Sequence, residues 1–356
     1  MNIIKNYILQ SAFKLNQIKK NKVFFETLKK LTQHHYKNCK KYKSLLNVIS
    51  PKFRSVNNIY DLPFLPVSLF KNYDLFSTDK KNILKTLTSS GTSRNIVSKI
   101  YLDKFNALNQ TKILSKIVSH YIGNKRCPML LFESKKTFTN KKLFSARGAA
   151  FLGFSIFSNS QTFALNDDGS VNISIIKKFL KKNINTKYII FGFTFVIWKA
   201  FFEEIKNIDS TIKFKNAILI HGGGWKKMES ISVTNIVYKF KIKKEFEIQK
   251  IHNYYGMVEQ TGSVFFECSK CGFFNTHNFS EIIIRDENFN VMKNNKSGII
   301  QLLSILPSSY PGHNLITEDL GFIYDKQDCE CYVLGKRFRV IGRVKKAELR
   351  GCSDVF

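Results

Sequence analysis

Short apolar runs alternate with helical segments through the middle of the chain, and this alternation limits the fold more than any other feature. Apolar residues recur at helical spacing over residues 173–180, 195–208 and 230–246. Continuous apolar runs lie between these segments, at residues 188–191 and 217–220. Strands that are apolar at every position are typical of parallel sheets, because helices cover both faces. We therefore predict an α/β fold with a mostly parallel sheet covered by helices.

The flanking regions have different patterns. Residues 3–47 carry apolar side chains at helical spacing, which predicts two or three amphipathic helices in an N-terminal cap, with His34 and His35 solvated or half-buried. The small residues at 146–150 predict a turn, and the short strands and turns after residue 263 predict a small β-rich lobe. The predicted regions are a helical cap at 1–60, an α/β core at 61–262, the lobe at 263–340 and a tail at 341–356.

The composition indicates a globular protein with an excess of positive charge. The chain has 356 residues and is 44% hydrophobic, which is enough for one large domain or two medium ones. Lys and Arg total 57 against 26 Asp and Glu, giving a formal net charge of +31. The lysines are spread along the chain with abundant Asn, Ile and Phe, as an A/T-rich coding sequence would produce. No nucleic-acid-binding signature accompanies them, so we expect no nucleic acid partner; an acidic protein or a lipid head group stays open.

The sequence also predicts a location. The first residues show no cationic segment followed by an apolar one, so we read no signal peptide. The most apolar run, residues 188–198, is too short to cross about 30 Å of hydrocarbon, so we expect no transmembrane segment. An odd number of cysteines, 7, argues against a disulfide framework and favours the reducing cytoplasm.

A hydroxyl-rich turn lies between two strand-like segments, residues 82–87 and 96–102. A small, polar turn lets a ligand approach the backbone and offers N–H and O–H donors, which suits a polyphosphate. It lacks the Gly-Lys-Ser/Thr of a Walker loop, and an ordinary hairpin is the alternative. Its residues are Thr88, Ser89, Ser90, Gly91, Thr92 and Ser93.

Two motifs follow predicted strands, where open α/β sheets bind their ligands. Gly222, Gly223 and Gly224 come directly after residues 217–220 and would leave a flat surface for a planar base or an acyl chain; a flexible turn is the alternative. Tyr255 and Gly256 follow the next strand, with Glu259 four residues after the tyrosine. An aromatic ring, a glycine and a carboxylate in this order can stack a purine and reach a phosphate-bound Mg²⁺.

Two shorter motifs lie further on. Thr317, Glu318 and Asp319 precede a glycine, and a carboxylate at such a turn suits the hydroxyls of a ribose. Gly342 and Arg343 begin a turn that supplies cations.

In this order the motifs resemble the core motifs of adenylate-forming (acyl-activating) enzymes, which activate carboxylates with ATP. Residues 65–71, 144–148, 192–194 and 350–352 look like the acyl-protein synthetase family, the long-chain fatty acid–protein ligases of bacterial bioluminescence. The resemblance extends from about Leu62 to Cys352.

The resemblance implies a fold and an activity. The fold would be the large N-terminal domain of adenylate-forming enzymes, with residues 61–262 as its adenylation core and 341–356 as a hinge remnant. The chain stops at Phe356, so we expect the C-terminal lid domain and its catalytic lysine to be absent; Lys345, Lys346 and Arg350 are the candidate replacements. The superfamily usually has Thr where this chain has Val258.

Roles carried over from the family define the predicted site. The turn at 88–93 would embrace the β- and γ-phosphates of ATP, and Gly222–Gly224, Tyr255 and Gly256 would form the adenine slot. Glu259 would bind Mg²⁺, Asp319 the ribose, and Arg343 the ribose or a phosphate. The products would be acyl-adenylate and pyrophosphate.

The resemblance also implies that Cys352 receives the acyl group as a thioester. Arg350 and Lys346 would lower the pKa of its thiol and Asp354 would oppose them; a surface cysteine is the alternative. The implied partners are a fatty acid and an acyl reductase or acyl carrier protein. Two other functions stay open: an acyl- or aryl-CoA ligase of the phenylacetate-CoA ligase type, and a nucleotide-binding module without catalysis. Aromatic side chains that either line an acyl pocket or pack in the core are Phe193, Phe195 and Trp198.

Two close cysteine pairs predict a metal site. Cys268 and Cys271 precede a glycine as in a zinc knuckle, and Cys329 and Cys331 could complete a tetrahedral set, with His277 as a substitute ligand. Four ligands leave no open position, so such a zinc would be structural. Four independent reduced cysteines are the alternative.

Overall fold

The structure is a computed structural model that describes residues 10–89, 97–139, 146–225, 232–325, 329–331 and 333–344. The chain divides into two compact units. Unit 1 comprises Met1–His120, Gly256–Phe265 and Phe273–Glu348, and unit 2 comprises Tyr121–Tyr255, Phe266–Gly272 and Leu349–Phe356. The helical segment 1–60 and most of the β-rich segment therefore lie in the same unit, and the four predicted regions stay a prediction.

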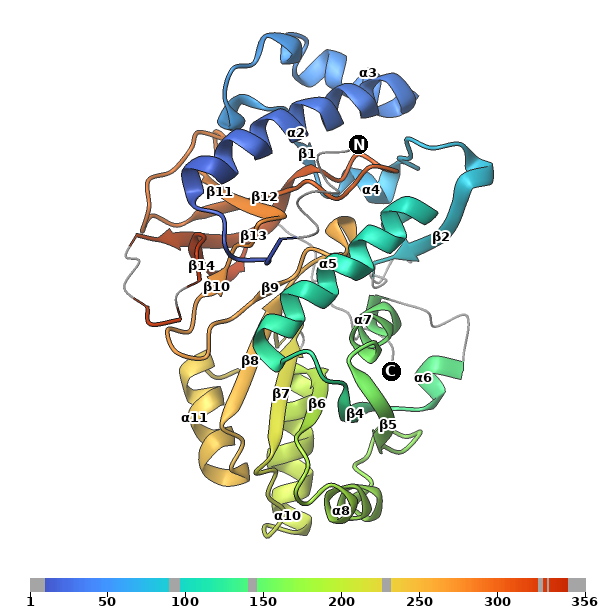
Figure 1. The fold of residues 1–356 in the computed structure, drawn as a ribbon, viewed down its shortest axis with the longest axis vertical. Coiled ribbons are helices and arrows are strands. Elements are labelled where there is room, and N and C mark those ends of the chain that lie inside the picture. The colour runs from blue at the N-terminus through green and yellow to red at the C-terminus, as the bar shows by residue number, and fades with distance from the viewer. Residues whose placement is uncertain are drawn as a thin grey trace. The chain divides into compact units, whose positions relative to one another are not determined.

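Unit 2 is built on a parallel sheet (Figure 1). Neighbouring strands pair in parallel register from β5 to β8, and every residue of the central strands β6 and β7 is buried. This confirms the predicted sheet with continuous apolar strands. In spatial order the strands are β5 (Ser158–Leu165), β4 (Cys127–Ser134), β6 (Tyr188–Phe193), β7 (Ala217–Gly222), β8 (Lys250–Tyr255) and β9 (Phe265–Phe266).

Helices pack on both faces of this sheet through aromatic side chains. On one face, the ring of Phe201 lies 5.2 Å from that of Phe132 and 4.6 Å from that of Phe246. On the other face, the ring of Phe154 lies 4.4 Å from that of Phe191. Burial of each phenylalanine side chain stabilises the folded state by about 1.5–3 kcal/mol. The helices of unit 2 are α6 (Lys136–Thr139), α7 (Ala146–Ser155), α8 (Ile173–Lys182), α9 (Thr194–Trp198), the π-helical turn η5 (Lys199–Ile205), α10 (Lys206–Ile208) and α11 (Asn235–Phe246).

Two features of unit 2 differ from the sequence analysis. Residues 146–150 do not form a turn but begin helix α7, because Phe151 and Phe154 further along it are buried against the sheet. Strand β5 was not predicted, because its sequence is polar at Ser158, Ser160 and Gln161 and exposed over residues 159–161. As an edge strand, β5 lacks the continuous apolar run of its neighbours.

Unit 1 contains an antiparallel sheet, which confirms the predicted change to short strands after residue 263. The two-residue strand β1 (Leu65–Pro66) pairs with β13 in parallel. Phe265 and Phe338 pack inside this unit with ring centroids 5.1 Å apart. The other strands, in spatial order, are β10 (Phe274–Asn275), β14 (Arg337–Arg343), β13 (Asn314–Tyr324), β12 (Gly298–Ser304) and β11 (Ser280–Arg285).

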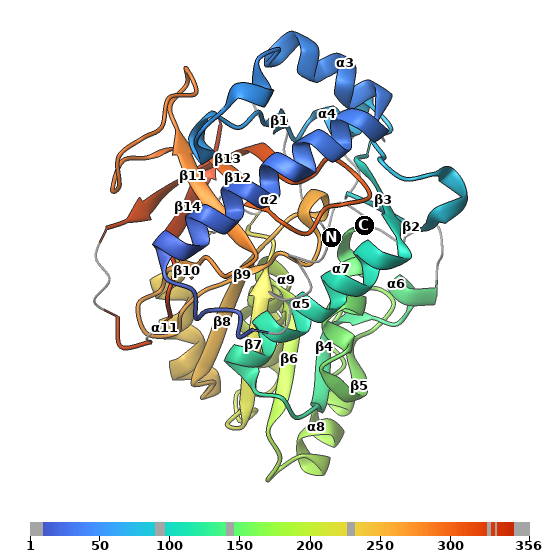
Figure 2. The same cartoon turned by 45° about the horizontal axis from the view of Figure 1, so that its top comes forward.

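Helices and a hairpin complete unit 1. Asn16 caps the first long helix by accepting a hydrogen bond from the backbone N–H of Lys19, at 2.9 Å. Figure 2 shows the hairpin of β2 (Ile83–Thr88) and β3 (Lys99–Asp103), which confirms the predicted strands around the hydroxyl-rich turn. The helices are α2 (Gln17–Asn38), α3 (Lys40–Ile49), α4 (Leu69–Asn72) and α5 (Lys104–Ile122), with 3-10 turns η1 (Phe53–Ser55), η2 (Ile59–Asp61), η3 (Lys80–Asn82) and η7 (Val258–Gln260).

One prediction about the N-terminal helices was wrong. His35 is fully buried rather than solvated or half-buried, because its ring stacks on His313, with centroids 4.9 Å apart. Its two ring nitrogens also find partners in Ser77 and the backbone carbonyl of Pro307. His34, by contrast, is exposed.

Among the described residues, no helix combines the length and the hydrophobicity needed to cross a lipid bilayer.

Candidate active site

The hydroxyl-rich turn grows from the β2–β3 hairpin of unit 1. Thr88 ends β2, and Ser89 closes the base of the turn by exchanging hydrogen bonds with Ser98. The N–H of Ser89 donates to the carbonyl of Ser98 at 3.1 Å, and the N–H of Ser98 donates to Oγ of Ser89 at 2.9 Å. The base of the turn is therefore fixed. Four predicted phosphate-binding residues lie outside the described residues, namely Ser90, Gly91, Thr92 and Ser93.

Glu259 lies in the 3-10 turn η7 of the same unit and is only 4% exposed. The next residue fastens this turn, because the side-chain amide of Gln260 donates to the carbonyls of Leu302 and Gly312 at 3.0 and 2.9 Å. Strand β3 packs against η7. The structure thus brings the hairpin that bears the hydroxyl-rich turn and the Glu259 segment together within unit 1.

Glu259 is a buried charge next to the buried phenol of Tyr310. Burial raises the pKa of the Tyr310 phenol, and the charge of Glu259 raises it further. Gly312 must lack a side chain, because a Cβ there would lie 2.6 Å from the carbonyl oxygen of Glu259. A buried carboxylate on a turn whose backbone is fastened in this way suits a divalent cation bound to a polyphosphate.

Asp319 and Arg343 face each other across β13 and β14 of unit 1. Nε of Arg343 lies 3.5 Å from Oδ1 of Asp319, and Nη2 of Arg343 lies 2.7 Å from Oε2 of Glu318. The N–H of Val344 also donates to the carbonyl of Glu318 at 2.9 Å. Asp319 and Arg343, which were predicted as separate site residues, are therefore brought together, with Glu318 as a second carboxylate on the same guanidinium.

The sequence analysis gave Glu318 no role, although it stands directly before Asp319. Alternation along a strand would send the two side chains to opposite faces. The pairing of β13 with β12 is irregular between Ile316 and Leu320, a stretch that contains both residues, and the long arginine reaches both carboxylates.

In unit 2, the predicted glycines lie at the carboxyl ends of parallel strands. Gly222 ends β7 opposite Tyr254, and a Cβ on Gly222 would come within 2.7 Å of that ring and 2.8 Å of that carbonyl. Gly223 and Gly224 have φ of +82° and +66°, which side chains rarely tolerate. Among the described residues, a Cβ on Gly224 would meet nothing within 4 Å, so they leave this part of the turn open. Tyr255 ends the neighbouring strand β8.

A threonine and a histidine hold this glycine turn, and the sequence analysis gave neither a role. Thr194, at the start of α9, places its hydroxyl 3.0 Å from Nδ1 of His221 and 3.0 Å from the carbonyl of Gly222. Both side chains are buried. The signal was present in sequence, because Thr194 follows one apolar strand and His221 precedes the glycines at the end of the next.

The predicted aromatic residues separate into two groups. Phe195 lines a cavity of about 400 Å³ with Leu165, Val196 and Ala200. Phe193 instead packs against Phe151, with ring centroids 5.7 Å apart, and Trp198 stacks on Tyr238 at 5.7 Å. Phe195 is thus the one of the three that lines this cavity.

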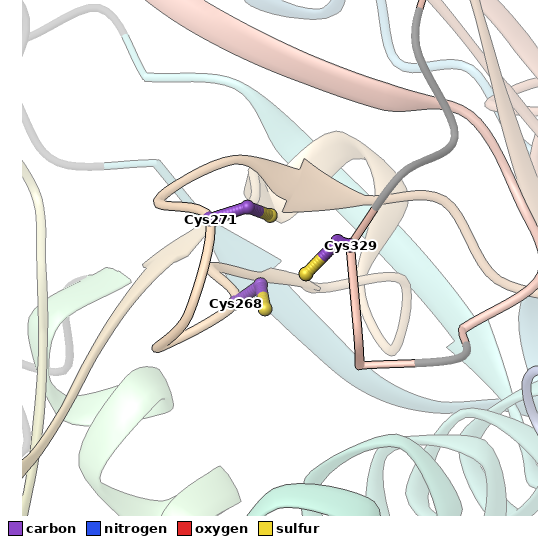
Figure 3. A group of neighbouring side chains, drawn as sticks. All are labelled: Cys268, Cys271 and Cys329. Carbon is purple, nitrogen blue, oxygen red and sulfur yellow. The ribbon is translucent and has the colours of Figure 1, made fainter.

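The cysteine motif at 268–271 folds as a tight turn. The N–H of Lys270 donates to Sγ of Cys268 at 3.4 Å, and the N–H of Gly272 donates to the carbonyl of Cys268 at 2.9 Å. Gly272 has φ of +71°, as such a turn requires. Figure 3 shows the side chains of Cys268 and Cys271 on this turn of unit 2. Cys329 and Cys331 belong to unit 1, so a metal site that they share with this turn stays a prediction.

His277 is buried in unit 1. Burial lowers the pKa of its imidazole well below the usual value, and its Nδ1 accepts a hydrogen bond from the N–H of Phe279 at 3.2 Å. Its ring packs on Phe265, with centroids 5.4 Å apart. These contacts account for the burial of His277 as part of the core of unit 1.

The other predicted catalytic groups lie outside the described residues, namely Lys345, Lys346, Arg350 and Cys352. Thr88, Ser89, Gly256, Glu259, Asp319 and Arg343 belong to unit 1, whereas Gly222, Gly223, Gly224 and Tyr255 belong to unit 2. That both groups serve one nucleotide stays a prediction.

Solved structures of other proteins share this fold. Two are of 2-hydroxyisobutyryl-CoA ligase. One is an open conformation in complex with 2-HIB-AMP and CoA: TM-score 0.68, 10% identity, covering 94% of this chain and 72% of that chain. The other is a postadenylation state with 2-HIB-AMP: TM-score 0.69, 11% identity, covering 94% and 69%. The amide bond synthetase McbA from Marinactinospora thermotolerans has a TM-score of 0.50 and 11% identity, covering 77% and 52%.

No curated protein matches the sequence. The profile of the family described as "Acyl-protein synthetase, LuxE" matches residues 2–356, which is nearly the whole chain. The chain therefore belongs to the acyl-protein synthetase family, and its fold is that of the adenylate-forming enzymes.

Proposed function

We propose that this protein is an ATP-dependent ligase that activates a long-chain fatty acid as acyl-adenylate and passes the acyl group to a cysteine thiol. Membership of the family supports the acyl substrate and the protein acceptor. The observation that carries the proposal is the packing of the Glu259 turn against the hairpin that bears the hydroxyl-rich turn. The proposed location is the cytoplasm.

In the first step, a carboxylate oxygen of the fatty acid attacks the α-phosphorus of ATP. An O–P bond forms, the bond from the α-phosphorus to the bridging oxygen breaks, and pyrophosphate leaves. This reaction needs orientation and neutralisation of charge more than covalent help from the protein. Glu259 would hold Mg²⁺, which neutralises the phosphates, while Asp319 and Arg343 would orient the ribose.

In the second step, a thiolate attacks the acyl carbonyl carbon, and AMP leaves with the oxygen. We propose Cys352 as this thiol, on the strength of its place in the family motif. A downstream acyl reductase or acyl carrier protein would then receive the acyl group.

Labelling with a radioactive fatty acid tests both steps. Incubation with Mg·ATP should yield AMP and a protein-bound label that neutral hydroxylamine releases. The label should vanish in Cys352→Ser, whereas AMP-forming activation by that variant should persist. Cys127→Ala is the matched control and should keep the label.

The same assay separates the other functions. Release of acyl-CoA only when coenzyme A is added would favour a CoA ligase, and a label retained by Cys352→Ser would exclude that thiol. Absence of AMP under all conditions would favour a module that binds nucleotide without catalysis.

We also propose a structural zinc ion at the Cys268–Cys271 turn, with Cys329 and Cys331 as the further predicted ligands. The N–H donated to Sγ of Cys268 supports this, because it favours the thiolate form that zinc requires. The glycine at position 272 provides the left-handed backbone that closes the turn.

A further inference from the structure

A single hydroxyl group joins two strand ends in unit 2. Oγ1 of Thr194 lies 3.0 Å from the carbonyl oxygen of Gly222 and 3.0 Å from Nδ1 of His221. Thr194 is 6% exposed and His221 is 1% exposed, so water competes little for these bonds. The contact links the end of β6 to the end of β7.

The hydrogen bonds of the Thr194 hydroxyl indicate which ring nitrogen of His221 carries a proton. A carbonyl oxygen only accepts, so the one hydroxyl proton of Thr194 must go to Gly222. The hydroxyl oxygen then accepts, so Nδ1 of His221 must carry a proton. If Nδ1 lacked one, two lone pairs would face each other at 3.0 Å.

The other ring nitrogen then carries a lone pair. Nε2 of His221 is buried, and among the residues that the structure describes it has no hydrogen-bond partner. The ring of Tyr238 lies 4.5 Å from the imidazole. Burial disfavours a second proton on the ring, and the positive charge of Lys239 disfavours it further, so the pKa of His221 is well below its usual value. The hydrogen-bond pattern and the burial together favour a neutral imidazole with its proton on Nδ1.

The hydrogen bond from Thr194 to the carbonyl of Gly222, here called the tether, restrains the glycine turn. Gly222, Gly223 and Gly224 have no side chains that could hold the conformation of the turn. A ligand that has to order these residues loses binding free energy to their conformational entropy. The ring of Phe193 packs beneath Gly223, and Trp225 anchors the far end by packing on Trp198, with ring centroids 5.3 Å apart. Gly222 itself pairs with Phe193 and Tyr254 at the end of the sheet, and the hydroxyl of Thr194 adds a hydrogen bond to its carbonyl.

We propose that Thr194 and His221 are positioning residues that pre-form the Gly222–Gly224 turn as a flat seat for the adenine ring of ATP. This rests on the proposed function, which assigns the adenine slot to these glycines. Because the tether touches the turn and no reacting atom, it affects nucleotide affinity and leaves the chemical step unchanged. Losing one buried hydrogen-bonded tether weakens binding about tenfold.

Direct binding of Mg·ATP to the full chain, measured by calorimetry, tests the proposal without relying on turnover. Thr194→Val removes the hydroxyl and should raise the Kd about tenfold, whereas Thr194→Ser keeps the hydroxyl and should restore it. In the labelling assay, Thr194→Val should raise KM for ATP and leave kcat close to wild type. Thr162→Val, in the edge strand β5 of the same sheet, is the matched control and should change neither.

A second readout reports the proton directly. In ¹⁵N spectra of the histidine side chains, His221 should show the neutral tautomer protonated at Nδ1, with its signals assigned by their loss in His221→Asn. An Nε2–H tautomer or an imidazolium at pH 7 would overturn the proposal, even if Thr194→Val fails to fold.

The outcomes separate the two proposals. Wild-type protein that does not bind Mg·ATP contradicts the proposed function itself. Wild-type binding with an unchanged Kd in Thr194→Val contradicts the positioning role and leaves the proposed function standing.

Discussion

At the scale of single residues, buried charged side chains and buried histidines make the stability of the fold depend on particular partners. Inside unit 1, Nζ of Lys20 lies 3.0 Å from Oε2 of Glu281, with side chains only 1% and 2% exposed. Lys336 approaches the other carboxylate oxygen at 3.5 Å, and Gln17 donates a hydrogen bond at 2.7 Å. Burial alone would raise the pKa of Glu281, but the two lysines hold it at about 2.

We predict that Glu281→Gln lowers the free energy of unfolding by about 3–5 kcal/mol, because it leaves a buried lysine charge without its partner. Urea unfolding at pH 7 measures this. Glu245→Gln breaks an exposed pair with Lys206 and should leave stability close to wild type. Equal effects of the two variants would show that the buried pair contributes no more than a surface one.

Because His313 is buried, we predict that the stability of the fold decreases in acid. Burial lowers its pKa to about 3 in the folded chain, against about 6.5 when unfolded. The unfolded state therefore binds more protons below pH 6.5, and stability falls as the pH drops from there towards 3. Between pH 7 and pH 5 this one histidine should lower the free energy of unfolding by about 2 kcal/mol. The same urea titration should show a shallower loss in His313→Gln, and an unchanged slope would contradict the assignment.

Elements were predictable where the sequence pattern and the packing agree. Strands β6 and β7 are buried at every position, and their continuous apolar sequences predict this burial. Strand β5 and helix α7 were not predicted, since an exposed polar edge strand and an alanine-rich helix start leave no such pattern. The burial of His35 depends on His313, which lies far away in the sequence, so no local pattern reveals it.

The glycine turn gives a prediction at the scale of one element. Gly222→Ala should destabilise the protein by about 3 kcal/mol, because its Cβ would meet the ring and the backbone of Tyr254 within 2.8 Å. Gly224→Ala should cost about 1 kcal/mol, because its φ of +66° strains a side chain but the space around it is open. Unfolding curves of the two variants compare these effects, and the reverse order would contradict the described turn.

The cysteine turn gives another prediction at this scale. Protein purified from zinc-supplemented cells should contain about one zinc ion per chain. Metal analysis by mass spectrometry should show its loss in Cys268→Ala and in Cys271→Ala and its retention in Cys127→Ala. Wild-type protein without bound zinc would indicate independent reduced cysteines instead.

At the scale of the whole molecule, the order of motifs predicted the family and the fold, and both were confirmed. The site was predictable only in part. The motifs named Asp319 and Arg343 separately, but the contacts of Arg343 with Asp319 and Glu318 depend on the pairing of β13 with β14, which no motif encodes. Thr194 and His221 stood beside predicted motifs, and only their shared hydrogen bond reveals a role.

The central claim is that Glu259, Asp319 and the hydroxyl-rich turn serve an ATP whose α-phosphorus a fatty carboxylate attacks. Exchange of radioactive pyrophosphate into ATP measures this step alone. We predict exchange that requires the fatty acid, persists in Cys352→Ser and falls about a hundredfold in Glu259→Gln and in Asp319→Asn. Exchange that is absent in the wild-type protein, or undiminished in both carboxylate variants, would contradict the account.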